Sequence, residues 1–310
     1  MQIFSSLSLA DLKVPTAIAL GNFDGLHLGH QAVIRPVLPG NIAPELTSTL
    51  VSFSPHPREF FGQNQRSLLT TLTEKIKILG KMGIEQLVLL DFNQGLANLS
   101  ATEFMHQVLQ EKLQAEYISV GFNFHFGAKR LGTVPDLKAK WGDRLHITSE
   151  QLDQNQRISS SSIRTALAEG NVIFANNFLG RAYSLTGKVV IGDRLGRQLG
   201  FPTANLELDP RKFLPKFGVY VVRVELEQQK ILGVMNVGVR PTVTGEAKQR
   251  IEVHLLNWQG DLYGKELTAE LIEFLRPEVK FASLNVLKAQ IQQDCERAIT
   301  FSDYLEYPYN

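Results

Sequence analysis

The sequence predicts an α/β protein of two domains: a parallel sheet with helices on both faces, followed by an antiparallel barrel or sandwich closed by a helix. The chain has 310 residues, more than one typical core holds. Up to about residue 180, short apolar runs alternate with helical patterns, which indicates a parallel sheet. After about residue 184 the apolar runs are β-rich and broken by Gly and Pro, which favours antiparallel strands.

Four buried strands and two helices are expected in the first half. The strands are the short apolar runs at residues 17–20, 49–53, 87–90 and 118–120. A helix over 74–82 ends at Gly83, a residue that readily takes the left-handed conformation at a helix end. Ser100 and Glu103 have the spacing of a capping box, so a second helix begins there and runs to about Leu113.

The second half is expected to hold strands at 219–224, 251–256 and 270–274, and a closing helix over 284–299. The pattern changes at a short join around residues 179–183. We therefore predict domains at residues 1–182 and 183–310.

Composition excludes several classes of protein. The chain is 44% hydrophobic and 20% charged, which argues against disorder, and its net charge of +1 draws in neither nucleic acid nor an anionic membrane. Its single cysteine, Cys295, cannot form an internal disulfide, which suits a reducing compartment. We see no signal peptide and no apolar run long enough to span a bilayer. We expect a cytoplasmic protein with small-molecule substrates, no nucleic-acid or membrane partner, and an oligomeric state that composition leaves open.

A glycine-punctuated turn with two histidines follows the strand at 17–20. Glycines let the backbone approach a phosphate closely, and amides at the start of a following helix favour an anion. Two histidines three residues apart can donate to one polyphosphate and stabilise the pyrophosphate that leaves when an α-phosphorus is attacked. The alternatives are two exposed histidines beside a loop, or a metal pair. The candidate nucleotide-binding residues are Gly21, Phe23, Gly25, His27, Gly29 and His30.

A run of serines at 159–162 precedes a predicted helix that contains Arg164. Serines cap helix starts and leave amides exposed, and an arginine on the first turn can bind a phosphate with two donors. A serine-capped helix with a surface arginine is the plainer alternative. Ser160, Ser161 and Arg164 are the candidate residues of a second phosphate-binding loop.

Two further strings follow predicted strands, at 54–59 and 121–127, where ligands dock in open α/β sheets. Asn123 offers amide hydrogen bonds. Phe124 and Phe126 are suited either to flank a planar ring or to pack in the core.

The His-x-Gly-His string resembles the signature of the nucleotidyltransferase superfamily, which includes cytidylyltransferases and class I tRNA synthetases. With the other strings it resembles the FMN adenylyltransferase module of bacterial bifunctional riboflavin kinase/FAD synthetases. The resemblance implies a Rossmann-like nucleotidyltransferase domain, adenylyl transfer, and a flavin bound near Asn123. The implied ATP site comprises His27, His30, Ser160, Ser161 and Arg164.

In the second half, residues 187–205 read as one long glycine-rich loop that includes Gly192 and Gly200 as candidate nucleotide-binding positions. Thr203 and Asn205 place two neutral oxygens on one face of extended backbone, and such oxygens suit Mg²⁺. On the strand at 251–256, alternation places Glu252 and His254 on one face. A carboxylate there can take the proton of an attacking hydroxyl, although an exposed strand glutamate is the plainer alternative.

The strings around these residues, from Phe217-Gly218-Val219-Tyr220 to Phe274-Leu275-Arg276-Pro277-Glu278, are similar in their order to flavokinases. The resemblance implies a six-stranded antiparallel β-barrel with a terminal helix. It also implies that Thr203 and Asn205 bind the metal–ATP complex and that Glu252 is the base for the riboflavin 5′-hydroxyl. A Walker A string is absent from the sequence, so an ordinary P-loop kinase does not explain the pattern.

The expected function is therefore two-step flavin coenzyme synthesis. The C-terminal domain would phosphorylate riboflavin to FMN, and the N-terminal domain would adenylylate FMN to FAD, with ATP as co-substrate and Mg²⁺ as cofactor. The alternatives are a riboflavin kinase with an inactive N-terminal domain, a flavin-binding regulator without turnover, and an adenylyltransferase for another substrate such as phosphopantetheine.

Overall fold

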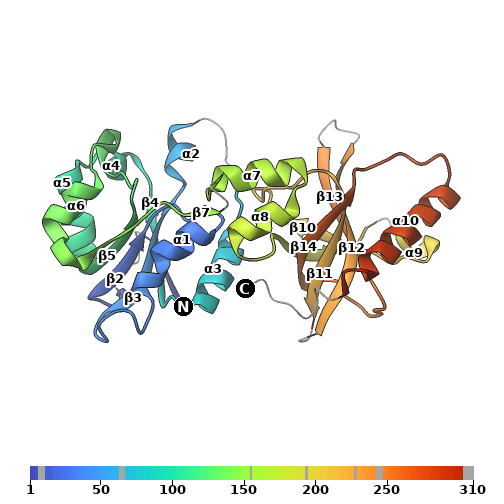
Figure 1. Ribbon diagram of the computed structural model, residues 1–310, viewed down its shortest axis with the longest axis horizontal. Helices are drawn as coiled ribbons and strands as arrows, with labels where there is room; N and C mark the ends of the chain where they lie inside the picture. Colours follow the sequence, from blue (N-terminus) through green and yellow to red (C-terminus); the bar gives the residue numbers. More distant parts are fainter. Residues whose placement is uncertain are drawn as a thin grey trace. The chain divides into compact units, whose positions relative to one another are not determined.

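The computed structural model describes residues 1–5, 11–62, 67–153, 156–192, 195–226, 229–241 and 247–302. The chain divides into two compact units, Met1–Ile158 and Ser159–Asn310 (Figure 1). No helix in these ranges is long and apolar enough to cross a bilayer.

The first unit is built on a parallel sheet of six strands in the order β1-β4-β3-β2-β5-β6. The four predicted strands are confirmed, and two short edge strands are added. From β2 the chain adds β3 and then β4 on one side of β2, and it then crosses to add β5 and β6 on the other side. The strand order therefore reverses between β2 and β5. Their bounds are β1 Gln2–Ser5, β2 Thr16–Leu20, β3 Thr47–Ser54, β4 Gln86–Asp91, β5 Ala115–Gly121 and β6 Leu145–Thr148.

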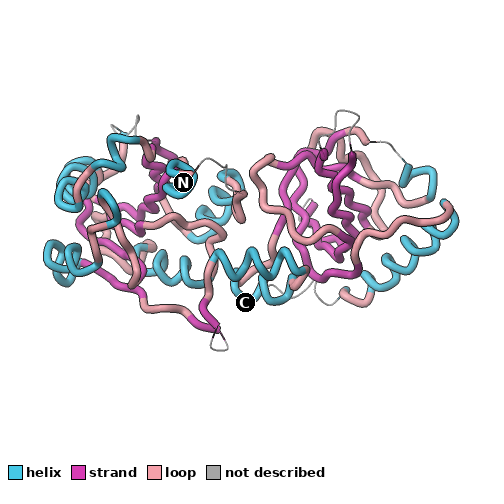
Figure 2. Tube along the Cα trace, turned by 90° about the horizontal axis from the view of Figure 1, so that it is seen from above, coloured by secondary structure: helices cyan, strands magenta, loops and turns pink. Residues whose placement is uncertain are grey.

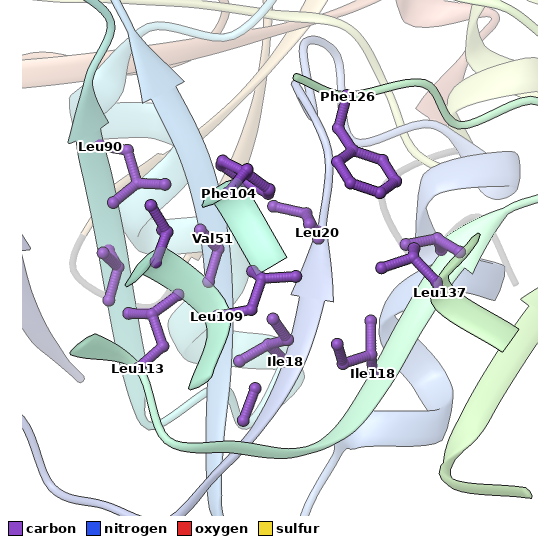
Figure 3. Close-up of a cluster of buried hydrophobic side chains, with 14 of the residues drawn as sticks. Ile18, Leu20, Val51, Leu90, Phe104, Leu109, Leu113, Ile118, Phe126 and Leu137 are labelled. Atoms are coloured by element: carbon purple, nitrogen blue, oxygen red, sulfur yellow. The ribbon is translucent and has the colours of Figure 1, made fainter. Parts of the chain in front are cut away.

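Helices cover both faces of this sheet, with α4, α5 and α6 on one side and α1 and α3 on the other (Figure 1). Alternation along β2 sends Ile18 and Leu20 into one core and Ala17 and Ala19 into the other. In the first core these strand residues pack with Leu109 and other helix residues (Figure 3). The helices are α1 Leu28–Ile34, α2 Pro57–Phe61, α3 Leu72–Met82, α4 Gln94–Asn98, α5 Ala101–Glu103 and α6 Val134–Trp141, with short 3₁₀ turns at Arg35–Val37, Ala128–Arg130 and Gly142–Arg144.

Both predicted helices of this unit form, one of them with a different geometry. α3 ends at Gly83, whose φ of 91° is left-handed, as expected. Ser100 and Glu103 make the predicted capping box, but the helix continues as a π-helix over Phe104–Lys112. There the Leu113 amide donates to the Val108 carbonyl, five residues back, and Val108, Leu109 and Leu113 are all buried.

The second unit begins with α7 (Ser160–Glu169) and α8 (Val172–Leu179), then forms a closed barrel of six antiparallel strands in the order β10-β13-β12-β11-β14-β9. The expectation of one long loop over 187–205 is wrong in part. The segment begins inside β9, contains a short helix, α9 Leu195–Leu199, and ends inside β10, while residues 193–194 lie outside the described ranges. The strands are β9 Ser184–Val190, β10 Ala204–Leu208, β11 Gly218–Leu226, β12 Gln229–Pro241, β13 Ala247–Leu255 and β14 Glu266–Arg276.

The closing helix α10 occupies Leu284–Ile299, as predicted, and packs against the outer face of the barrel (Figure 2). Its buried Cys295 and Ala298 contact outward-facing apolar residues of the barrel such as Val234 and Ile272. The barrel therefore has two apolar surfaces, an interior and one outer wall beneath α10.

Helices α7 and α8 pack on the barrel, within the second unit. The Asn176 amide donates to the Leu271 carbonyl at 2.9 Å and accepts from the Tyr183 amide at 2.7 Å. The Lys216 amide donates to the Leu167 carbonyl at 2.8 Å. The compact unit that contains the barrel therefore begins at Ser159, whereas the sequence motifs place the division between residues 182 and 183.

We expect Leu109→Ala to lower the free energy of unfolding of the first unit by about 2–5 kcal/mol, because it opens a cavity in the core at a residue with 0% exposure. The matched control is Leu131→Ala, since Leu131 is 73% exposed. Urea unfolding followed by Trp141 fluorescence in a Trp258→Phe background reports on this unit. Equal losses in the two variants would contradict the assigned core.

Candidate functional site

The predicted histidine turn follows β2, at the point where the strand order of the sheet reverses. His27 caps α1: its Nδ1 accepts from the backbone N–H of His30 at 3.2 Å. In the neutral imidazole the proton of His27 is therefore on Nε2. The two rings stack with centroids 3.6 Å apart and planes 17° from parallel. The turn thus holds its imidazoles as one rigid pair.

Two glycines of the predicted motif leave room or backbone freedom for the turn. A Cβ on Gly29 would lie 3.1 Å from two atoms of the His27 ring, so a side chain there would push the ring by a few tenths of an ångström. Gly25 has φ 94°, a conformation that L-residues rarely adopt. Phe23 is 1% exposed and meets His30 edge-on, with centroids 5.3 Å apart. Phe23 is therefore a buried residue that packs against the His30 ring.

Buried polar groups anchor the turn. The Asp24 carboxylate accepts from the amides of Leu69 at 3.0 Å and Thr70 at 3.3 Å, and the Ser52 hydroxyl donates to the Asn22 carbonyl at 3.0 Å. Burial lowers the pKa of the Lys75 amine, and the Asp24 carboxylate opposes part of that shift. These anchors hold a backbone that includes left-handed conformations at Phe23 and Leu26.

On the other side of the point of reversal, the segment after β5 carries Asn123, which is exposed. The two nearby phenylalanines behave as core residues. Phe126 is 5% exposed and packs on Phe104, and Phe124 stacks on Phe126 with centroids 5.8 Å apart. Figure 3 shows Phe126 at the edge of the first core.

An aromatic cluster that sequence reasoning missed lies at the carboxyl ends of β3 and β4. Phe53, Phe60, Phe61 and Phe92 contact one another edge-on, and Phe61 is 70% exposed. The signal was present in the sequence, because Phe60 and Phe61 follow the Ser-Pro-His-Pro string and Phe92 follows an apolar strand. An exposed aromatic surface at this edge suits a planar ring.

The predicted second phosphate loop is the start of α7. The cap is Ser159, whose hydroxyl accepts from the Ser162 amide at 3.1 Å, so Ser160 and Ser161 occupy the first helical positions. Arg164 is half-buried. Its Nη1 donates to the Ser160 carbonyl at 3.2 Å, and its guanidinium lies 5.8 Å from the centre of the Phe213 ring. These residues belong to the second unit, and the histidines belong to the first.

In the barrel, two of the predicted kinase residues, Asn205 and Glu252, lie in one cross-strand row. Asn205 of β10 pairs directly with Glu252 of β13, which in turn pairs with Asn236 of β12. Directly opposed residues share a face, with Cβ atoms about 4.5–5.5 Å apart. Ile251, Val253 and Leu255 are buried on the other face, so the predicted alternation of Glu252 and His254 is confirmed.

This row borders a cavity of about 300 Å³ on the outer wall of the barrel, beside α9 and α10. The cavity brings together Thr203, Glu252 and His254, which the sequence singled out. His254 is held by a 2.8 Å hydrogen bond between its Nδ1 and the Pro202 carbonyl. The full lining is Gly196, Leu199, Phe201, Thr203, Val219, Val234, Asn236, Arg250, Glu252, His254, Arg276, Glu278, Val279, Phe281, Leu287, Ile291 and Asp294.

The neutral oxygens of Thr203 and Asn205 are of the type that Mg²⁺ takes, so they fit the metal site that the sequence predicts. The side-chain amide of Asn205 fills the space that a Cβ on Gly192 would need, and the Thr203 hydroxyl lies 3.2 Å from the Cβ position of Gly196. Gly192 therefore makes room for Asn205. Gly200, with φ 92°, turns the chain after α9. Within the described residues, no three His, Cys, Asp or Glu side chains lie close enough together to hold a metal ion.

Several cavity residues were missed by sequence reasoning. Arg250 Nη2 lies 2.9 Å from Glu252 Oε2. Asn236 donates to the Glu278 carboxylate at 3.0 Å, and Arg276 pairs with Asp294 through three contacts of 2.7–3.1 Å. Asn236, Arg276 and Glu278 were inside strings noted in the sequence, but their partners lie on other elements.

Comparison with protein families matches both halves of the chain. Residues 10–162 match the model for FAD synthetase, and residues 179–302 match the model for riboflavin kinase. The first match includes the histidine turn, Asn123, Ser160 and Ser161 but ends before Arg164. The second includes the whole cavity of the barrel.

Relatives match over most of their length. The bifunctional riboflavin kinase/FMN adenylyltransferase from Pseudomonas fluorescens is 40% identical to this chain, over 90% of each chain. The one from Escherichia coli K12 is 39% identical, over 89% of this chain and 90% of its own length. The one from Bacillus subtilis 168 is 36% identical, over 93% of each chain. A Streptococcus pneumoniae crystal structure titled as a macrolide-efflux protein has a TM-score of 0.87 and 31% identity, covering 97% of this chain and all of that one. From both family matches and these relatives, the chain belongs to the bifunctional riboflavin kinase/FMN adenylyltransferase family.

Proposed function

We propose that this chain phosphorylates riboflavin at the barrel cavity, with Glu252 as base, and adenylylates the resulting FMN at the histidine turn. The observation that carries the kinase half is the cavity of about 300 Å³ lined by Thr203 and Glu252, with Asn205 directly opposite Glu252. An apolar wall beside a strand carboxylate suits a flavin whose hydroxyl must lose a proton.

In the kinase step, Glu252 takes the proton from the riboflavin 5′-hydroxyl as its oxygen attacks the γ-phosphorus of ATP. The new O–P bond gives FMN, and the bond to the bridging oxygen breaks to release ADP. The strand position of Glu252 limits its motion, so the carboxylate is oriented before substrate arrives. Thr203 and Asn205 would hold Mg²⁺ through neutral oxygens, and the bound cation would neutralise phosphate charge.

In the adenylylation step, a phosphate oxygen of FMN attacks the α-phosphorus of ATP and pyrophosphate leaves. The nucleophile is already ionised, so this step needs donors for the departing charge more than a base. His27 and His30 supply them, as a stacked pair whose first member carries its proton on Nε2 when neutral. Ser160, Ser161 and Arg164 form the second phosphate loop, and Gly21, Gly25 and Gly29 allow the close backbone approach.

The flavin ring of FMN binds near Asn123, in the segment after β5, where Phe122 is 44% exposed. The aromatic cluster after β3 and β4, with Phe61 70% exposed, offers a second ring face at the carboxyl ends of the strands. The functional division of the chain falls at 182/183. We place the enzyme in the cytoplasm without nucleic-acid partners, on the basis of its single buried cysteine and its net charge of +1.

The experiment that tests this function is a time course of the purified chain with riboflavin, ATP and Mg²⁺, with the flavins separated chromatographically. We expect FMN to rise first and FAD to follow, and excess EDTA to stop both. FMN alone would favour a kinase with an inactive first domain. Bound riboflavin without product would favour a flavin-binding regulator, and turnover in EDTA would remove the metal from the proposal.

We expect Glu252→Gln to lower FMN formation by about 10²–10⁴-fold, because the uncharged amide cannot accept the hydroxyl proton. FAD formation from supplied FMN should persist. The control is Glu225→Gln, the same change at an exposed position of β11. Initial rates of both steps are measured on each variant. Loss of both activities in Glu252→Gln would mean that the two sites are not separable.

We expect His30→Ala to lower FAD formation from supplied FMN by about 10²–10³-fold, the usual effect of removing one donor to a developing charge. Riboflavin phosphorylation should be unchanged. His106, whose side chain is 64% exposed in the same unit, provides the control His106→Ala. An unchanged rate of FAD formation in His30→Ala would exclude the histidine pair from the mechanism.

A further inference from the structure

The barrel cavity contains two ion pairs of very different strength. Its acidic and basic lining residues, within the described ranges, are Arg250, Glu252, Arg276, Glu278 and Asp294, together with His254. Arg250 pairs with Glu252 and Arg276 with Asp294, while Glu278 accepts from Asn236. During phosphoryl transfer, negative charge is spread over the three equatorial oxygens of the transferred group, and an arginine free to leave its partner can bind them.

Arg276 is fixed. Its Nε and Nη2 make three contacts of 2.7–3.1 Å with both oxygens of Asp294, whose side chain is only 4% exposed. Gln290 also donates to Asp294 at 3.1 Å, and Arg276 Nη1 donates to the Pro277 carbonyl at 3.2 Å. Withdrawing Arg276 would leave a buried carboxylate without its cation, which is strongly unfavourable. This pair is a wall of the cavity.

Arg250 is held far less tightly. One nitrogen, Nη2, lies 2.9 Å from one oxygen of Glu252, and the side chains are 38% and 16% exposed. The two residues are two positions apart on β13, so they share its cavity-facing side. Arg250 therefore has room to turn toward a ligand without leaving a deeply buried charge behind.

We propose that Arg250 is a catalytic residue of the kinase step, which pairs with Glu252 before transfer and with the γ-phosphoryl group during it. The inference rests on the proposed role of Glu252 as base. A base that takes the 5′-hydroxyl proton must lie within about 3 Å of the attacking oxygen, and that oxygen must lie about 3–3.5 Å from the phosphorus. A guanidinium 2.9 Å from the base is then within reach of the phosphoryl oxygens.

The charge changes of the reaction drive this exchange of partners. As the O–H bond breaks, the proton goes to Glu252 and neutralises the carboxylate that held Arg250. As the new O–P bond forms, the bond to ADP breaks and its electron pair leaves with ADP, while the transferred group keeps its negative charge spread over three equatorial oxygens. Arg250 therefore loses one anionic partner while another lies within reach, and its planar fork matches two phosphoryl oxygens.

The test compares Arg250→Gln and Arg250→Lys in the full chain, with Lys230→Gln as a control for loss of a positive charge at an exposed barrel position. Single-turnover rates of FMN formation, riboflavin dissociation constants from flavin fluorescence, and FAD formation from supplied FMN are measured on each. We expect Arg250→Gln to slow FMN formation by about 100-fold with riboflavin affinity and FAD formation within twofold of the parent. Arg250→Lys keeps the charge without the fork and should lose about tenfold.

A second arm separates contact with the phosphoryl group from orientation of Glu252. In Arg250→Ala, free guanidinium at millimolar concentration should restore part of the rate of FMN formation. Three outcomes would each overturn the proposal. The rate of FMN formation could be unchanged in Arg250→Gln, or the loss could be confined to riboflavin affinity. The third outcome is that neither lysine at position 250 nor free guanidinium restores the rate. Full kinase activity in Glu252→Gln would instead show that Glu252 is not the base. That result would contradict the proposed function and not the role of Arg250 alone.

Discussion

The proposed kinase site depends on the register of three antiparallel strands. Because β10, β13 and β12 pair so that Asn205, Glu252 and Asn236 lie in one row, the amide proposed to hold the metal and the proposed base share one face of the barrel. A slip of one residue would send Glu252 into the apolar interior and Val253 into the cavity. Closure of the barrel prevents this slip, since each strand is paired on both sides.

The histidine turn of the first unit depends on a different constraint, which is the stabilisation of left-handed backbone conformations at residues other than glycine. Phe23 and Leu26 have positive φ without being glycine, a conformation that costs free energy of order 1–3 kcal/mol per residue. Buried groups on both flanks, Asp24 and Ser52, hold the turn in place. The cost is met by core packing of Phe23 and Leu26, which are almost completely buried.

The two proposed sites differ in their polar side chains, as the two nucleophiles require. A hydroxyl nucleophile needs a base, and the barrel supplies a strand carboxylate at a cavity. A phosphate nucleophile is already ionised, and the carboxylate within the histidine turn, Asp24, is buried and engaged by backbone amides. The turn instead presents imidazoles, the donors proposed to stabilise the departing charge. This division follows from the substrates and agrees with two family matches on one chain.

The sequence by itself determined the elements whose signals are local. The apolar runs of β2 to β5, the capping box at Ser100, the left-handed end of α3 and the closing helix α10 each follow from neighbouring residues. The same holds for the alternation that places Glu252 and His254 together. The resemblance of its motifs to known enzymes pointed to the family before the fold was known.

Only the tertiary structure decided what depends on residues distant in the chain. The edge strands β1 and β6 are four residues long and gain their order from pairing with β4 and β5. α7 and α8 belong with the barrel because Asn176 and Lys216 bond across elements. Phe126 is buried in the first core, and Arg276 pairs with Asp294, which lies eighteen positions away in the chain. Strand pairing and packing bring such partners together, and no local pattern records which residues will meet.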